Sequence, residues 1–134
     1  MIDDLETFFA ASTGVIAAFL FGSQVRGRSH AESDVDVGVL LDSEVFPEAV
    51  DRGRVRINMI SELMGLLEKN EVDVVVLNDA PPGLAREVVT TGMRVFVANE
   101  DCTRDFIRDV QLRAADLDPF LDRVRRRSLE FLTR

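Results

Sequence analysis

The sequence lacks tyrosine and tryptophan entirely and contains one cysteine, Cys102, and one histidine. A single cysteine cannot form an internal disulfide bond, and it cannot supply the cysteine cluster of a structural zinc site. No stretch approaches the ~20 consecutive apolar residues that a membrane-spanning helix requires. The N-terminal segment MIDDLETFF is acidic and does not resemble a signal peptide. These absences predict a cytoplasmic protein that spans no membrane.

Positive charge is also scarce. The chain carries 24 acidic and 16 basic side chains, which gives a net charge of −8. Such a surface disfavours non-specific binding to nucleic acid. A triphosphate that arrives with Mg²⁺ remains compatible, because the metal offsets nearby carboxylates. With 134 residues, of which 46% are hydrophobic, the chain is sized for one domain with a real core.

Apolar residues recur with two different periods along the chain, which separates predicted helices from predicted strands. Helical spacing predicts helices over residues 3–12, 48–69 and 82–89, and from residue 101 onward with an interruption at Pro119. Short apolar runs predict strands over residues 15–21, 35–41, 72–77 and 93–97. The third run, VDVVVL, favours a strand buried on both faces. We expect an α/β (α+β) protein, a small mixed β-sheet flanked by helices. Residues 1–98 would form its core, and residues 99–134 would form C-terminal helices that pack on the core or on a partner.

One stretch carries the candidate chemistry. Gly22 and Ser23 follow the first predicted strand. Asp34 and Asp36 enter the second strand after an intervening segment of ten residues. Glycine followed by a hydroxyl at the end of a buried strand lets the backbone approach a phosphate closely. Two aspartates separated by one residue on a strand point to the same side. Carboxylates beside a phosphate seat predict a Mg²⁺ site that acts on a nucleoside triphosphate.

A third carboxylate, Asp73, interrupts the otherwise apolar third strand. A charge at such a position is unfavourable unless it is paired or binds a cation. If this strand lies beside the second, Asp73 can face Asp34 and Asp36, and the three could hold two Mg²⁺ ions about 4 Å apart. Asp73 would then act as general base for a hydroxyl that attacks the α-phosphorus and expels pyrophosphate. The alternative is a buried ion pair of Asp73 with Arg86 or Arg94.

The segment between the two strands also contributes candidate phosphate contacts. Ser23 and the backbone N–H groups after Gly22 would hold the leaving phosphates. Arg26 or Arg28 could neutralise the charge that develops on them. The alternative for both arginines is a solvated position in the loop.

The glycine–serine pair, the two aspartates at their spacing and the aspartate of the third strand together resemble the nucleotidyltransferase superfamily of DNA polymerase β. The short chain, Arg26-Gly27 after that pair and Ser33 before the first aspartate resemble the minimal nucleotidyltransferase (MNT) antitoxins of prokaryotes. The resemblance covers about residues 5–98. It implies a polymerase β-like nucleotidyltransferase fold with ATP as substrate and Mg²⁺ as cofactor.

Many MNT proteins are encoded beside a HEPN-domain ribonuclease and silence this toxin by transferring AMP from ATP to one of its tyrosines. By resemblance, Gly22 and Ser23 would seat the nucleotide, with Arg26 nearby. Asp34 and Asp36 would bind Mg²⁺, and a third aspartate on the later strand would complete the site. Because this chain has no tyrosine, such an acceptor must lie on another molecule. We therefore expect a HEPN toxin as partner, in a homo-oligomer or a hetero-oligomer with it. Two alternatives stay open: a nucleotidyltransferase of the aminoglycoside type that modifies a small hydroxylated compound, or an antitoxin that neutralises by binding alone.

Overall fold

The computed structural model describes residues 1–22 and 35–115. Its helices are α1 (Ile2–Ala11), α2 (Ala49–Leu67) and α3 (Pro82–Thr91), followed by a helix over residues 100–115. Its strands are β1 (Val15–Phe21), β2 (Val35–Leu41), β3 (Val72–Val76) and β4 (Met93–Val97), and the short 3-10 helix η2 (Leu77–Asp79) follows β3. Within these ranges no helix combines the length and the apolar character that crossing a bilayer demands.

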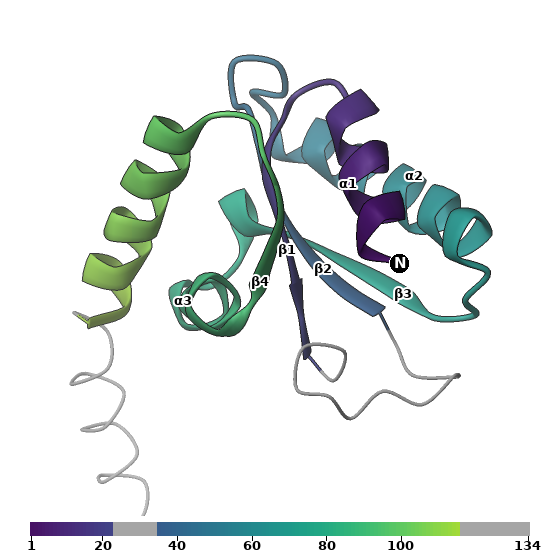
Figure 1. Cartoon of the computed structure of the whole chain (residues 1–134). Coiled ribbons are helices and arrows are strands. Elements are labelled where there is room, and N and C mark those ends of the chain that lie inside the picture. Colours follow the sequence, from purple (N-terminus) through teal and green to yellow (C-terminus); the bar gives the residue numbers. More distant parts are fainter. Residues whose placement is uncertain (23–34, 116–134) are drawn as a thin grey trace, which may run out of the picture.

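The strands form one mixed sheet in the order β3-β2-β1-β4. β1 runs antiparallel to both β2 and β4, whereas β2 and β3 are parallel and are connected through α2. Figure 1 shows α1 and α2 on one face of this sheet, and α3 with the helix over residues 100–115 on the other. The mixed sheet flanked by helices that the sequence predicts is confirmed.

The sheet separates two hydrophobic clusters, because successive side chains of a strand point to opposite faces. The first cluster joins alternate residues of the strands to α1 and α2, through Leu5, Phe9, Met59 and Leu63. The second joins the other face to α3 and the last described helix, through Ala85, Val88 and Val110. The central strands β1 and β2 therefore read as nearly continuous apolar runs.

Most predicted boundaries agree with the structure. β1, β2 and β4 have the predicted ends, and α1 lies within one residue of its prediction. α2 ends at Leu67, because Glu68 adopts a left-handed backbone conformation with φ 54°. β3 is one residue shorter than predicted because Leu77 starts η2. The last helix begins at residue 100, and its predicted interruption at Pro119 lies outside the described residues.

The predicted burial of β3 on both faces is correct only in part. β3 pairs with β2 alone and forms an edge of the sheet, as the described residues have it. Val72, Val74 and Val76 point into the first cluster, whereas Asp73 is exposed. On the same face as Asp73, Val75 is half-buried against the second cluster, so the second face of β3 is partly covered.

The helix over residues 100–115 packs on the sheet through Val110, which is fully buried in the second cluster. The sequence predicts that residues 99–134 pack on the core or on a partner. That choice stays a prediction, since residues 116–134 lie outside the part of the chain that the structure describes.

Candidate active site

Two of the three predicted acidic residues are neighbours across the parallel strand pair. In the β2–β3 register, Asp36 lies opposite Asp73, and Val35 lies opposite Val72. Neighbouring strands are about 4.8 Å apart, and paired residues of parallel strands present their side chains on the same face. The flanking valines, Val35 and Val37, belong to the first cluster, so both aspartates lie on the opposite face of the sheet. The fold thus places these two aspartates at paired positions of neighbouring strands.

Gly22 lies directly beside the first of these carboxylates. It follows Phe21, which pairs with Asp36 in the antiparallel β1–β2 register. Its φ is +80°, a backbone conformation that residues other than glycine rarely adopt. A Cβ atom at this position would lie 2.5 Å from Oδ2 of Asp36. Glycine is therefore required here, both by the backbone conformation and by the close approach of the carboxylate.

Asp73 pairs with Arg56, a residue of α2 that was not among the predicted site residues. Nη2 of Arg56 donates to Oδ1 of Asp73 at 3.0 Å, and Nε donates to the carbonyl oxygen of Val74 at 2.6 Å. The two paired side chains are 44% and 52% exposed. The alternative of a buried ion pair with Arg86 or Arg94 is therefore wrong, because the strand lies at the sheet edge and α2 passes beside it.

The remaining predicted site residues, Ser23, Arg26 and Asp34, lie outside the described residues, as does Arg28. Within residues 1–22 and 35–115, no three histidine, cysteine, aspartate or glutamate side chains converge as a metal site would require. The predicted set needs Asp34 as its third member. The roles assigned to all these residues therefore stay predictions.

The described part of the site has a definite chemical character. Two carboxylates on one face offer hard oxygen ligands, which is the donor type that Mg²⁺ prefers. The adjacent glycine lets the carboxylate of Asp36 lie against the backbone, and Arg56 adds one positive charge at the rim. This donor set fits a magnesium-bound phosphate ligand and does not fit a soft metal such as zinc held by thiolates.

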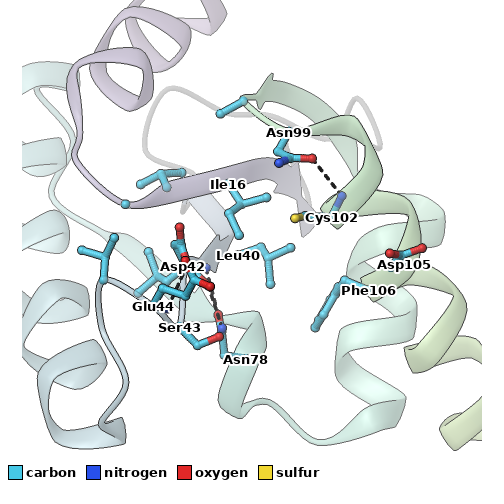
Figure 2. Close-up of a pocket in the computed structure, with 15 residues that line it drawn as sticks. Ile16, Leu40, Asp42, Ser43, Glu44, Asn78, Asn99, Cys102, Asp105 and Phe106 are labelled. Carbon is cyan, nitrogen blue, oxygen red and sulfur yellow. Dashed lines mark hydrogen bonds between the residues drawn. The ribbon is translucent and has the colours of Figure 1, made fainter.

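A cavity of about 780 Å³ lies at the opposite end of the sheet, where β2 ends and β1 begins. Figure 2 shows Asp42, Glu44 and Asp105 among the side chains that line it. Two polar groups there already have partners, since Oδ1 of Asn99 accepts from the backbone N–H of Cys102 at 3.0 Å. Its lining does not include Gly22, Asp36 or Asp73, so the cavity is separate from the candidate active site.

The helical periodicity of the sequence indicates on which face of the helix Arg56 lies, but not which strand lies beside that face. Arg52 and Arg56 are four residues apart, so they share one face of the predicted helix. Val55 and Met59 point toward the sheet, which places the two arginines beside the edge of the adjacent strand. Which strand lies at that edge is a property of the sheet order, and the sequence does not specify it.

Several solved structures share this fold. A chain of a toxin–antitoxin complex with AMP-PNP is 23% identical, with a TM-score of 0.69 over 92% of this chain and 97% of that one. A chain of a mutant MntA toxin–antitoxin complex is 25% identical, with a TM-score of 0.64 over 86% and 89%. A chain of the tri-AMPylated Shewanella oneidensis HEPN toxin in complex with MNT antitoxin is 22% identical, with a TM-score of 0.58 over 92% and 88%.

No curated protein matches this chain. A family model does, under the description "Polymerase beta, Nucleotidyltransferase", and the match extends over residues 3–101. This range includes α1, the whole sheet and both aspartates that the β2–β3 register brings together. The chain belongs to the polymerase β nucleotidyltransferase family.

Proposed function

We propose that this chain is the antitoxin of a toxin–antitoxin pair, and that it transfers AMP from ATP to a tyrosine hydroxyl of a HEPN toxin in the cytoplasm. The observation that carries the proposal is the pairing of Asp36 with Asp73 beside Gly22, within a nucleotidyltransferase fold. The related complexes support the substrate and the partner, since one contains AMP-PNP and another an AMPylated HEPN toxin.

The proposed reaction has a simple balance of atoms. The acceptor oxygen forms a bond to the α-phosphorus of ATP, and the bond from that phosphorus to the pyrophosphate oxygen breaks. Asp73 accepts the proton of the attacking hydroxyl, a role open to it because its side chain is 52% exposed. Pyrophosphate leaves opposite the acceptor, toward the backbone after Gly22, where Ser23 and Arg26 would stabilise its charge.

Asp34, Asp36 and Asp73 would hold the magnesium ions. When bound, Mg²⁺ would offset the charge of the phosphates and increase the acidity of the attacking hydroxyl. Asp36 and Asp73 suit this purpose because their carboxylates lie on one face and supply oxygen ligands. Asp36 also has its Oδ2 directed toward Gly22, where the phosphates would approach.

The acceptor must belong to another molecule, because the chain contains no tyrosine. Asp73 lies on the edge strand β3 and its side chain is 52% exposed, so a second protein can reach it. A partner toxin that presents a tyrosine at this edge would place the phenolic oxygen beside Asp73.

Mass spectrometry of the toxin tests this proposal. The chain is co-expressed with a candidate HEPN toxin from the same genome, and the toxin is examined for added adenylate. We expect adenylate on a toxin tyrosine with the wild-type chain, and none with the double variant Asp34→Asn, Asp36→Asn. Asp42→Asn is the matched control, because Asp42 follows the opposite end of β2. This control should leave the modification unchanged.

The outcomes separate the competing functions. A double variant that still neutralises the toxin fully would show that neutralisation works by binding alone. A wild-type chain that leaves the toxin unmodified but adenylylates a small hydroxylated compound would identify the other enzymatic alternative. Either result would overturn the proposed function.

A further inference from the structure

We propose that Arg56 is a positioning residue for the reaction, and that it orients the carboxylate of Asp73 toward the metal and the acceptor hydroxyl. This inference rests on the proposed function, because it concerns the same site. It adds a residue that lies on α2, outside the sequence motifs of the strands.

The guanidinium of Arg56 is held at two points of β3. Nε donates to the backbone carbonyl of Val74 at 2.6 Å, and Nη2 donates to Oδ1 of Asp73 at 3.0 Å. The carbonyl belongs to the strand itself, so it anchors the guanidinium relative to the backbone. The second contact then fixes the orientation of the neighbouring carboxylate. Arginine suits this double contact because its donors form a planar, rigid fork.

This arrangement engages one carboxylate oxygen and leaves the other outside the contact. A carboxylate has about four acceptor positions on two oxygens. With Oδ1 of Asp73 held by Arg56, Oδ2 can bind a cation or accept a proton without losing the ion pair. Catalytic groups must be held within about 0.5 Å of the productive geometry, and residues behind them usually provide that support.

A purely stabilising role does not account for the pair. Arg56 and Asp73 are 44% and 52% exposed, and ion pairs this open to solvent contribute little to stability. The bond to Val74 also covers a carbonyl of the sheet edge, which is a second structural role open to Arg56. An effect of Arg56 on catalysis that depends on Asp73 would distinguish orientation from protection of the edge.

The test compares Arg56→Ala with Arg54→Ala, which removes an exposed arginine from the same helix. With toxin and ATP, we expect Arg56→Ala to lower kcat by about 10–100-fold, the usual effect of losing a residue that supports a metal ligand. At saturating Mg²⁺ the KM for ATP should stay within about twofold, since the proposal gives Arg56 no contact with the nucleotide itself. Arg54→Ala should match the wild type in both constants.

Binding of Mn²⁺ with AMP-PNP, followed by electron paramagnetic resonance, provides a readout that needs no turnover. We expect Arg56→Ala to weaken Mn²⁺ binding by about 10-fold in the wild-type background. In an Asp73→Asn background the same change should alter binding by less than about twofold, because the residue through which Arg56 acts is gone.

The outcomes keep the two proposals apart. If the wild-type chain modifies the toxin and Arg56→Ala does so at the same rate, this inference is overturned and the proposed function stands. An equal loss of Mn²⁺ binding in both backgrounds would also overturn it, because Arg56 would then act independently of Asp73. If the wild-type chain neither modifies the toxin nor binds Mn²⁺ with AMP-PNP, both proposals fail.

Discussion

The two ends of the β-sheet contain similar polar side chains, but the protein uses them in opposite ways. The far end of the sheet is the one where β2 and β3 finish. There, Asn78 binds both backbone groups of Leu41, accepting from the N–H at 2.9 Å and donating to the carbonyl at 2.8 Å. Both oxygens of Asp79 accept from Arg52, at 2.8 and 2.9 Å. At the site end, Asp73 has one oxygen in a single contact with Arg56.

The difference lies in what remains available to a ligand. Arg52 is only 12% exposed, and its third contact, from Nη1 to the carbonyl of Phe46 at 2.8 Å, ties the segment before α2 to η2. At this end of the sheet, the side chains of Asn78, Asp79 and Arg52 all have partners within the protein. The site end leaves Asp73 half exposed beside Asp36. An acidic residue at a strand end is thus a functional indication only where the fold leaves its side chain exposed, as it does for Asp73.

The largest expected effect comes from exchanging a carboxylate for an amide at each end. Asp73→Asn should lower kcat by about 10²–10⁴-fold, because loss of a general base has this typical effect. Asp79→Asn should leave kcat unchanged, since both oxygens of Asp79 are already bound to Arg52. Steady-state rates of toxin adenylylation measure both variants. Equal losses from the two substitutions would contradict the division between the ends.

The glycine beside Asp36 offers a second way to disturb the site end alone. Gly22→Ala places a methyl group 2.5 Å from Oδ2 of Asp36 at a φ of +80°, so the carboxylate or the backbone must move. A displacement of about 1 Å near reacting groups can lower the rate by about 100-fold. Gly53→Ala on α2 is the control, because a Cβ there meets nothing within 4 Å. If Gly22→Ala retains the wild-type rate, the assigned phosphate approach is wrong.

At the far end the corresponding change should affect stability and not rate. Asn78→Ala leaves the N–H and the carbonyl of Leu41 without their partner, which should lower the free energy of unfolding by about 1–3 kcal/mol. Chemical denaturation measures this loss, and adenylylation of the toxin should continue at the wild-type rate. Asn58→Ala, at an exposed position of α2, should not lower stability. An Asn78→Ala variant as stable as the wild type would mean that solvent replaces both bonds.

The sequence predicts the fold well because its strongest signals are local. β1, β2 and β4 are short apolar runs bounded by turn residues, so their limits follow from periodicity. The same reasoning is only partly right for β3, an edge strand, where VDVVVL suggests burial on both faces but Asp73 is exposed. Whether a strand lies at the edge or in the centre depends on the order of strands in the sheet, which is a property of the whole chain.

Some features of the candidate site are likewise visible in the sequence, and others depend on the fold. The spacing of Asp36 after Gly22 is visible in the sequence, and so is the lone charge at Asp73. That Asp36 and Asp73 occupy the same register position depends on the parallel pairing of β2 with β3. Arg56 could not be assigned from the sequence, because its role arises where a helix passes a strand that is close in space and distant in the chain.

The smallest expected effect is the dependence of the far-end ion pair on pH. The hydrogen bond from Arg52, the largest influence, holds the pKa of Asp79 below its ordinary value of 3.8, against an opposing effect of burial. A carboxylate whose pKa is lowered by folding stabilises the folded state above its unfolded pKa, and this contribution disappears as pH falls through the folded pKa.

Asp79→Asn should therefore lower the free energy of unfolding at neutral pH by at most about 1 kcal/mol, because solvent screens a pair that is open on one side. The difference between wild type and variant should be constant above about pH 5 and should shrink below about pH 4. Denaturation midpoints across this range measure it, with Arg52→Ala, Asp79→Asn as the double variant. A difference that grows as pH falls would require Asp79 to bind its proton more tightly in the folded state, which is the opposite of what its contact with Arg52 dictates.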